Sequence, residues 1–358
     1  MLVIEQYTIA TTPKYNFPQP TMDTTLPQRF IELSMHSLRS AENQTFQLNQ
    51  QNLQQTNGNE LQGFHLRLQP ITLKPRHEQT IVAAVDTSSM KIGETRTGML
   101  IAVRGAAVWK QNRQYKYMRL GPFLFHTTEE NKREIYETLQ KAYFSHDHMH
   151  LGLLGIMQMP TRIANLLEKW LQTMLSKTLN NSLILFDGSL TSGTADTPIH
   201  LMKELLSTAR KRGNVVLAFS KMTNLRVNGH IITEMLPSYK PPYLLEAIGL
   251  RPKPPIVLQG DIYVARLTNG NCAFRLDVDK EVPFEQRIES VEKLLGSDVL
   301  TQSYPETLRL AHILCTFTAN EVIAMQHFIA RKCGLRMVNR PDMHRLLFGP
   351  FGKGESNS

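Results

Sequence analysis

Two apolar runs that each end in an aspartate constrain the fold of this chain more than any other feature of its sequence. Residues 81–85 lead into Asp86, and residues 183–186 lead into Asp187, which Gly188 follows at once. Short apolar runs of this kind are typical of strands buried on both faces, as in a parallel sheet. A carboxylate at the tip of a buried strand loses part of its water shell, which costs free energy unless a partner compensates it. The two runs therefore predict buried strands and raise the question of what neutralises their terminal charges.

The order of elements along the chain predicts how those two strands are placed. The further elements are expected at 97–125 (two or three strands), 162–179 (helix), 197–212 (helix) and 214–221 (strand). The order strand, strand, strand, helix, strand, helix, strand is that of a ribonuclease-H-like sheet. This α/β fold has antiparallel first strands, parallel central strands and flanking helices. Its first and fourth strands are neighbours, so we expect Asp86 and Asp187 to lie side by side.

Composition divides the chain into three segments. Residues 1–79 are expected to be a partly irregular N-terminal extension, because the stretch 43–63 is rich in Gln, Asn and Thr and lacks the apolar density for a core. Residues 80–345 are expected to form the main domain, within which the Pro-rich stretch 240–255 is expected to be a crossing. Residues 346–358 are expected to be a flexible tail.

The overall composition favours a basic protein of the cytoplasm. The net charge of +9 favours a polyanionic partner, most simply nucleic acid. The three cysteines are far apart and fit neither a disulfide framework nor a zinc site, which suits a reducing compartment. No apolar run approaches the ~20 residues that span a bilayer. The N-terminus has no basic region followed by a long apolar core, so we expect neither a signal peptide nor a membrane partner.

Part of the positive charge alternates with aromatic residues between 104 and 119. Cations beside flat rings suit a phosphate backbone and stacked bases, so Lys110, Arg113 and Lys116 are candidate DNA-binding residues. The alternative is a hairpin with one aromatic face packed inward and a basic face in solvent. The sequence leaves both interpretations open.

The paired aspartates predict a metal site. Two carboxylates held close together repel each other unless something neutralises both, and oxygen-rich sites suit Mg²⁺ or Mn²⁺. Two such ions ~3.5–4 Å apart can activate water and stabilise the leaving oxygen during phosphodiester cleavage. For either aspartate alone, the commoner role is to cap a turn at a strand end. The pairing at two strand ends, each followed by small turn residues, favours the metal site.

Two further side chains are candidates for the same site. Glu168 falls just outside the apolar arc of the helix at 162–179, where it could reach the end of the sheet. It could equally be a surface residue paired with a lysine or arginine one turn away. His312 lies among apolar residues of a C-terminal helix, where a histidine is usually a core residue, although a neutral imidazole can also bind metal or transfer a proton.

Several stretches together resemble the NurA nuclease family, in family order and from about residue 80 to 335. They are VAAVDTSS, LILFDGSL, VVLAFSK, DIYVARL with FRLDV, and YPETLRLAHI, of which LILFDGSL and YP-x-x-L-x-x-AH are the most specific. The resemblance implies a ribonuclease-H-like, Mn²⁺-dependent DNA nuclease that acts on single strands and on duplex ends, 5′ to 3′, in end resection during double-strand break repair. It also implies a homodimer that docks on a hexameric HerA-type ATPase.

The resemblance implies roles for six residues. It matches Asp86, Glu168 and Asp187 to the family's acids, His312 to its histidine, Tyr263 to its active-site tyrosine and Lys221 to a basic residue after the next strand. Two departures concern the third acid and the first turn. Thr87 stands where the family usually has glycine, and Arg162 precedes Glu168 at a looser spacing than the family's arginine.

Rival interpretations remain open. The same fold could serve as a catalytically weak or silent DNA-binding scaffold, or as a nuclease of RNA or RNA–DNA hybrids, because recognition of a 2′-hydroxyl is not visible in the sequence. The stretch SHDHMH at 145–150 alternates three histidines, which could hold zinc if it were a strand, although a loop fits the residues that follow better.

Overall fold

The structure, a computed structural model, describes residues 25–40, 65–143, 155–194, 196–227, 230–335 and 337–338 of the chain. Three predictions fall outside these residues: the irregular stretch at 43–63, the histidine-rich stretch at 145–150 and the tail at 346–358.

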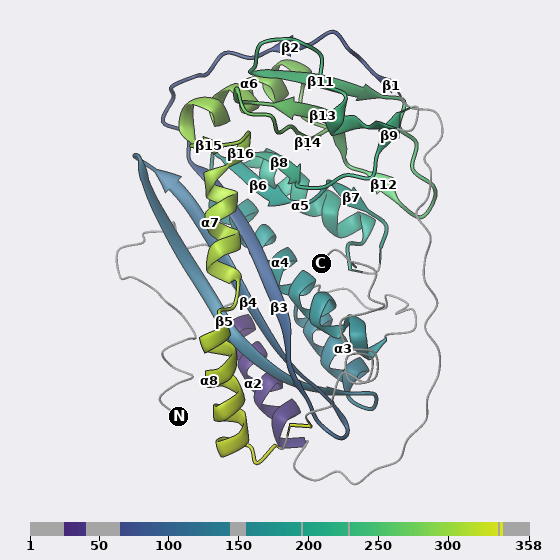
Figure 1. Ribbon diagram of the computed structural model, residues 1–358, viewed down its shortest axis with the longest axis vertical. Coiled ribbons are helices and arrows are strands. Elements are labelled where there is room, and N and C mark those ends of the chain that lie inside the picture. The colour runs from purple at the N-terminus through teal and green to yellow at the C-terminus, as the bar shows by residue number, and fades with distance from the viewer. Residues whose placement is uncertain are drawn as a thin grey trace, which may run out of the picture.

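A 10-stranded mixed sheet forms the centre of the described structure (Figure 1). Its strands follow the order β1-β11-β13-β14-β8-β6-β3-β4-β5, and β2 pairs with β11 beside β1. The bounds are β1 (His65–Leu66), β2 (Ile71–Thr72), β3 (Val82–Glu94), β4 (Gly98–Gln111), β5 (Gln114–Thr128), β6 (Leu183–Asp187), β8 (Val215–Ser220), β11 (Tyr243–Ile248), β13 (Gly260–Arg266) and β14 (Phe274–Asp279). Three two-stranded pairs lie apart from it: β7 (Thr191–Ser192) with β12 (Val257–Leu258), β9 (Arg226–Val227) with β10 (His230–Ile231), and β15 (Leu300–Thr301) with β16 (Tyr304–Pro305).

The centre of the sheet has the ribonuclease-H-like order, which confirms the predicted fold class. β3, β4 and β5 form an antiparallel meander, whereas β3, β6 and β8 run parallel to one another. The first and fourth of these five strands, β3 and β6, are therefore neighbours. The segments that pair in parallel, 82–85, 183–186 and 215–219, are apolar and buried because helices cover both faces of the sheet.

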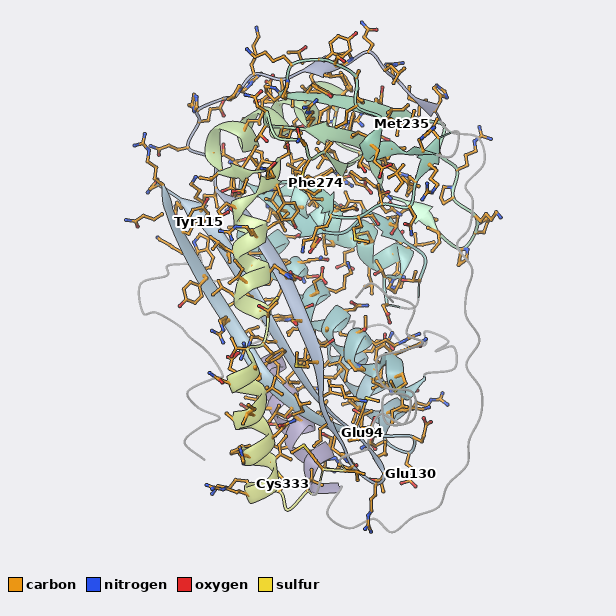
Figure 2. All side chains as sticks on the ribbon, in the orientation of Figure 1. Glu94, Tyr115, Glu130, Met235, Phe274 and Cys333 are labelled. Carbon is orange, nitrogen blue, oxygen red and sulfur yellow. The ribbon has the colours of Figure 1, made fainter. Side chains whose placement is uncertain are left out.

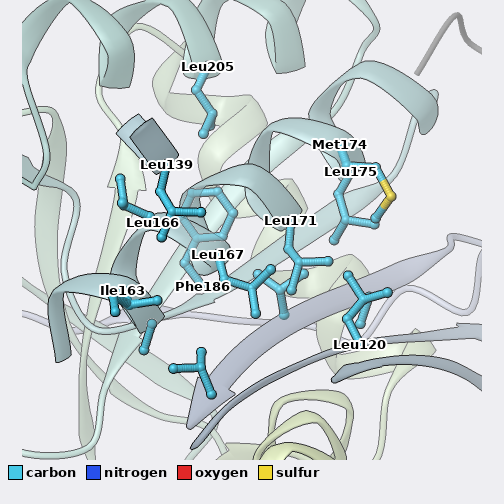
Figure 3. Close-up of a cluster of buried hydrophobic side chains, with 14 of the residues drawn as sticks. Leu120, Leu139, Ile163, Leu166, Leu167, Leu171, Met174, Leu175, Phe186 and Leu205 are labelled. Carbon is cyan, nitrogen blue, oxygen red and sulfur yellow. The ribbon is translucent and has the colours of Figure 1, made fainter. Parts of the chain in front are cut away.

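Helices cover the two faces of the sheet in separate groups. One face packs against α2 (Thr25–Ser40), α3 (Lys132–Tyr143), α4 (Met159–Thr178) and α5 (Ile199–Lys211). The other face packs against α6 (Phe284–Ser297), α7 (Glu306–Cys315) and α8 (Ala319–Lys332). Two short 3₁₀ helices, η2 (Ile156–Gln158) and η3 (Ile232–Glu234), complete the described elements. Figure 3 shows part of the first core, in which leucines of α4 pack over Phe186 of β6.

The helix predicted at 162–179 is α4, the helix predicted at 197–212 is α5, and the strand predicted at 214–221 is β8. Two features of the fold differ from the sequence-based expectation. β3 does not end at Asp86 but continues to Glu94, because β4 pairs with it along its whole length. The Pro-rich stretch at 240–255 contains strand β11, whose Leu244 and Leu245 are fully buried, so its description as a crossing was wrong for residues 243–248.

The described parts of the predicted N-terminal extension join the main body. Phe30 of α2 is fully buried against Phe123 and Phe125 of β5, with ring centroids 4.8 Å and 6.0 Å apart. β1 and β2 extend the sheet by pairing with β11. Local apolar density was therefore a poor guide to these short segments, since their burial depends on distant partners.

One stretch of the described residues, Glu306–Lys332, is long and apolar enough to cross a membrane by length and composition, and an 18-residue window within it has a mean hydropathy of 1.2. The expectation concerned uninterrupted apolar runs, and polar residues such as Asn320 and Glu321 interrupt this stretch. In the structure the stretch is broken into α7 and α8, and α7 packs on β3 and β4. At the break, the fully buried Arg104 pairs with Glu321 and bonds the carbonyl of Thr316.

Candidate active site

Asp86 and Asp187 lie next to each other where the parallel strands β3 and β6 separate. Val85 pairs with Phe186 in the last register pair, so the two aspartates occupy the positions that follow. The alternate residues before them belong to one core cluster on the α6–α7 face, namely Val82, Ala84, Leu183 and Leu185. Because side chains alternate between faces along a strand, both carboxylates lie on the face that α7 covers.

Gly188 allows the chain to turn away directly after Asp187. Its φ is +102°, a conformation that side-chain-bearing residues rarely adopt, although a Cβ there would meet nothing within 4 Å. Its N–H donates to the carbonyl of Phe219 at 2.8 Å, and its carbonyl accepts from the hydroxyl of Ser220 at 2.7 Å. The turn is therefore tied to the end of β8, which fixes the backbone that carries Asp187.

Helix α7 brings His312 and Cys315 to the first aspartate. The Nδ1 atom of His312 lies 2.7 Å from Oδ2 of Asp86, and the backbone N–H of Thr87 donates to Oδ1 of Asp86 at 2.7 Å. Cys315, one turn after His312, is buried, and its thiol lies within 3.2 Å of the carbonyl of His312. Ligand atoms of Asp86, His312 and Cys315 all lie within 4.8 Å of one another. The histidine predicted from the sequence is thus in contact with the first predicted aspartate.

Helix α4 brings Glu168 to the site from the opposite face of the sheet. β6 ends at Asp187 while β3 continues. Beyond Val85, the edge of β3 that faces away from β4 therefore has no strand beside it in the described structure, which leaves room for Glu168. The helix lies so close to the sheet that a Cβ on Gly105 would be 2.8 Å from Leu171. The hydroxyl of Thr87 also donates to the carbonyl of Ala164, one turn before Glu168, at 3.3 Å.

A short hydrogen-bonded chain holds the Glu168 carboxylate. The amide of Gln172, which is 1% exposed, donates to Oε1 of Glu168 at 2.7 Å. Its carbonyl oxygen accepts from the ammonium of Lys169 at 2.9 Å. Gln172 lies four residues after Glu168, the spacing at which helical side chains meet. It therefore links the carboxylate to a nearby positive charge and limits its rotamers.

Burial and neighbouring carboxylates raise the pKa of two of the acids, Asp86 and Glu168. Burial raises the pKa of Asp86, and the charge of Asp187 raises it further, while the hydrogen bond to His312 acts in the opposite direction. Burial, together with the charges of Asp86 and Asp187, raises the pKa of Glu168 to about 7, although Lys169 opposes the shift. The three acids therefore form a cluster whose negative charge the protein only partly compensates.

Lys221 and Tyr304 lie beside the second aspartate. The Nζ atom of Lys221 is 2.6 Å from Oδ2 of Asp187 and 5.7 Å from the ring centroid of Tyr304. The buried hydroxyl of Tyr304 has no hydrogen-bond partner in the described part of the chain. Burial and the charges of Asp187 and Asp86 raise its pKa well above the usual value. Tyr304 therefore presents a neutral hydroxyl near two carboxylates.

An open groove begins at Asp187 and follows the end of β8. Its lining includes two cations, Lys221 and Arg275, and several hydroxyl and amide side chains, namely Ser189, Ser220, Thr223 and Asn224. The carboxylate of Asp277, which is buried, accepts two hydrogen bonds from Arg275 at 2.6 Å and one from the backbone of Leu190 at 3.0 Å. A second cavity lies between α4 and α5 beside Lys169 and Asp196, and none of the three acids lines it.

Tyr263, which the resemblance matched to an active-site tyrosine, lies apart from the acids. It belongs to β13, and the β14 and β8 strands separate it from β6. Its hydroxyl accepts from Arg287 at 3.3 Å, and burial raises its pKa to about 12. At about 4.8 Å between neighbouring strands, its backbone is about 14 Å from that of Asp187. Tyr304 is the tyrosine that the structure brings to the acids.

The basic and aromatic stretch at 104–119 forms parts of the β4–β5 hairpin. Trp109 is 5% exposed and Tyr115 donates to Asp298 at 2.7 Å, so these rings are engaged in the protein. Lys110 lies over the Tyr115 ring at 5.2 Å, and Arg113 is exposed in the turn. Lys110 of β4 lies opposite Val82 of β3. Val82 is four residues, or about 13 Å along the strand, from Asp86. Figure 2 shows Tyr115 at the upper end of this hairpin.

The aromatic side chains of the hairpin do not share one face: Trp109 packs in the core under α2–α5, Tyr115 packs against the core on the other side of the sheet, and Tyr117 is exposed. Lys110, Arg113 and Lys116 are not brought together with the acids, and their DNA-binding role stays a prediction. Lys221 is the one predicted DNA-binding residue that the structure brings to the acid cluster.

Three residues of the cluster were missed by the sequence analysis: Gln172, Tyr304 and Cys315. Each had a local signal, because Gln172 is four residues after Glu168 and Cys315 is three residues after His312, while Tyr304 opens the YP motif. Two other glutamates, Glu130 just before α3 and Glu134 in its first turn, are exposed. Figure 2 shows Glu130 beside Glu94, at the opposite end of the long strands from Tyr115.

Comparisons with known proteins give structural likenesses of low identity. No family model matches the chain, and no curated protein matches it. The NurA nuclease of Sulfolobus solfataricus has a TM-score of 0.46 and 16% identity, over 74% of this chain and 88% of that one. Endonuclease V of Bacillus subtilis has a TM-score of 0.34 and 12% identity, over 74% and 86%. Endonuclease V of Ciona intestinalis, solved in complex with DNA, has a TM-score of 0.33 and 11% identity, over 72% and 92%.

At identities and TM-scores this low, the likenesses concern only the arrangement of elements. The fold class rests on the observed strand order, and the interpretation of the site rests on its own residues.

Proposed function

We propose that this protein is a metal-dependent DNA nuclease whose centre is formed by Asp86, Glu168, Asp187 and His312. The observation that carries the proposal is the convergence of three carboxylates from two parallel strands and one helix, with a histidine bonded to the first of them. Carboxylates grouped in this way can hold divalent cations, which suit phosphodiester hydrolysis because negative charge develops on oxygen.

The donor set fits a divalent cation. Asp86, Glu168 and Asp187 offer the carboxylate oxygens that Mg²⁺ and Mn²⁺ prefer, and His312 adds a nitrogen that Mn²⁺ accepts more readily than Mg²⁺. The raised pKa values of Asp86 and Glu168 are consistent with this, because burial and then the repulsion between carboxylates raise them, and a bound cation would offset both. A bound ion of this type supplies an attacking hydroxide at neutral pH and stabilises the leaving oxygen.

The chain's own residues have separate tasks in this scheme. Asp86 orients the His312 ring through Nδ1, which leaves the ring in a fixed position to bind an ion or hold the scissile phosphate. Lys221 holds one oxygen of Asp187 and places a positive charge where a phosphate would approach. The Tyr304 hydroxyl is neutral at physiological pH, so it can donate a hydrogen bond to a phosphate oxygen or to water.

The groove beside Asp187 supports a nucleic acid strand as the substrate. Lys221 and Arg275 line it, each paired with an aspartate, and the neighbouring hydroxyl and amide groups can bond to phosphate oxygens. Single-stranded DNA and duplex ends are the substrates that the NurA resemblance implies. On that resemblance we also propose single-strand endonuclease and 5′-to-3′ exonuclease activity in end resection, a homodimer, a HerA-type ATPase partner and a cytoplasmic location.

The test is cleavage of labelled single-stranded DNA with Mn²⁺ by the protein and by Asp86→Asn and Asp187→Asn. Each substitution keeps the side-chain shape and removes a charge, so we expect at least a 10²-fold loss of rate. Asp261→Asn is the matched control, since Asp261 is a strand residue of β13 that pairs with Arg287 away from the cluster. Undiminished cleavage by both variants would falsify the proposal. A panel that includes RNA and RNA–DNA hybrids tests the substrate class in the same assay.

The alternative function is a catalytically weak or silent DNA-binding scaffold. The ion pair of Lys221 with Asp187 favours it, because a protein ammonium already neutralises part of the cluster. Calorimetric titration with Mn²⁺ separates the two functions. Binding that Asp187→Asn abolishes supports the nuclease, whereas DNA binding without any Mn²⁺ binding supports the scaffold.

A further inference from the structure

The cluster contains a donor that the proposed nuclease chemistry does not use. Cys315 is fully buried on α7. Its Sγ and donor atoms of Asp86 and His312 all lie within 4.8 Å of one another. Cys272, by contrast, is exposed, and Cys333 is buried at the end of α8. The sulfur at the acid cluster therefore has a different environment from the other two.

The three donors form a set with its own metal preference. Thiolate, imidazole and carboxylate together are typical ligands of Zn²⁺, whereas the hard ions Mg²⁺ and Mn²⁺ prefer an oxygen set such as Asp86 with Asp187 and Glu168. Affinity for nitrogen and sulfur donors also rises from Mn²⁺ to Zn²⁺ along the divalent series. The same aspartate thus belongs to two overlapping ligand sets of different softness.

The geometry allows the second set to close around one ion. Zinc bonds of about 2.0–2.3 Å in a tetrahedral site place ligand atoms about 3.3–3.8 Å apart. The observed limit of 4.8 Å requires shifts of about 1 Å, which side-chain rotations can supply. His312 and Cys315 are three residues apart on one helical face, so α7 holds both toward Asp86. His312 is half exposed, which gives an ion a route to the site.

We propose that Asp86, His312 and Cys315 bind Zn²⁺, and that the zinc-bound form is inhibited because Asp86 is withdrawn from the Mn²⁺ or Mg²⁺ centre. Zinc binding deprotonates the thiol and releases the proton to solvent, with no change of oxidation state. The inhibitory half of the inference rests on the proposed nuclease function, whereas the binding half does not.

The binding test uses Co²⁺ as a spectroscopic substitute for Zn²⁺ in the full-length protein. A cysteine thiolate bound to Co²⁺ gives an intense near-ultraviolet charge-transfer band, and tetrahedral coordination gives visible bands. We expect both in the wild type, with displacement by one equivalent of Zn²⁺, and retention in the controls Cys272→Ser and Cys333→Ala. We expect the charge-transfer band to be lost in Cys315→Ser and in Cys315→Ala. Its absence from the wild type, or its persistence in both Cys315 variants, overturns the inference.

A measurement on the wild type covers the case in which the Cys315 variants do not fold. X-ray absorption of the zinc-loaded protein is expected to show one sulfur ligand at about 2.3 Å with nitrogen and oxygen ligands. A zinc site with oxygen and nitrogen ligands alone contradicts the inference without any substitution.

The inhibition test compares cleavage with Mn²⁺ at increasing Zn²⁺, with each variant normalised to its own rate in Mn²⁺ alone. We expect the concentration of Zn²⁺ that halves the rate to rise at least about tenfold in Cys315→Ser and to be unchanged in Cys272→Ser. Equal inhibition of all three proteins contradicts the inhibitory half. If the wild type does not cleave DNA at all, the nuclease proposal fails, and the Co²⁺ spectra still decide whether the zinc site exists.

Discussion

The unusual pKa of Glu168 predicts that this carboxylate destabilises the metal-free protein at neutral and basic pH. Its pKa in the folded protein is about 7, against an ordinary value of 4.5. A raised pKa means that the folded state binds the proton more tightly than the unfolded state. The stabilisation that comes from this proton is fully present below the ordinary pKa of 4.5, and it is lost as the pH rises through about 7. The shift corresponds to about 3 kcal/mol at 1.36 kcal/mol per unit, or about 2 kcal/mol after allowance for partial exposure.

Glu168→Gln removes this titration and keeps the side-chain size. We therefore expect the difference in unfolding free energy, variant minus wild type, to be about 2 kcal/mol larger at pH 8 than at pH 5 when a chelator is present. The assay is urea unfolding followed by the fluorescence of Trp109 and Trp170 at both pH values. Glu130→Gln, an exposed glutamate at the other end of the long strands, is the control and should show no such gain.

Two results would refute this reasoning. The first is a wild type and a Glu168→Gln variant with the same dependence on pH, since the carboxylate would then titrate normally. The second concerns Mn²⁺, which should stabilise the wild type more than the variant at pH 8 because it binds the folded protein through the carboxylate. Equal stabilisation of the two proteins would remove Glu168 from the proposed metal site.

Three further predictions concern residues around the cluster. Tyr304→Phe removes a buried hydroxyl that has no partner in the described structure, so we expect unfolding free energy to change by less than about 1 kcal/mol while DNA cleavage falls at least tenfold; an unchanged cleavage rate removes Tyr304 from the site. Burial acts to raise the pKa of Glu321, but hydrogen bonds from Arg104 and Thr318 outweigh it and lower the pKa to about 2. Glu321→Gln should therefore cost about 1–2 kcal/mol at pH 7, after allowance for solvent screening, and less than half of that at pH 3, measured by urea unfolding; an equal cost at both pH values contradicts the ion pair as its cause. Gly188→Ala forces alanine to a φ of +102° and should cost about 1–2 kcal/mol of stability, with a larger loss of cleavage because Asp187 shifts; crystals of an active variant with an unchanged turn would contradict this.

The sequence predicted the centre of the fold because the relevant signals are local. An apolar run that ends in a carboxylate, followed by a helix and a second such run, allows few topologies once strand order and handedness are considered. The adjacency of Asp86 and Asp187 follows from that order alone. The amphipathic pattern of α4 likewise gave a helix within a few residues of its observed bounds, Met159–Thr178.

The parts that could not be predicted depend on contacts between distant segments. β11 lies between two Pro-rich stretches, and its pairing with the distant strands β13, β1 and β2 makes it a strand. Tyr304 and Cys315 reach the site because α7 docks on β3, a contact between residues more than 200 positions apart. No local pattern encodes that contact. The family resemblance likewise matched Tyr263 to an active-site tyrosine from a short local motif. The strand order, which the motif does not encode, separates Tyr263 from the acids.

The separation of 226 residues between Asp86 and His312 has a consequence for the cell that makes this protein. At roughly 5–20 residues per second, a ribosome needs roughly 10–45 s to go from the first codon to the second. Throughout that interval the nascent chain holds its acidic side chains without the imidazole that completes them. The cluster of Asp86, Glu168, Asp187 and His312 is therefore incomplete until α7 has been synthesised and has docked on β3, so any chemistry that needs His312 begins only after that delay.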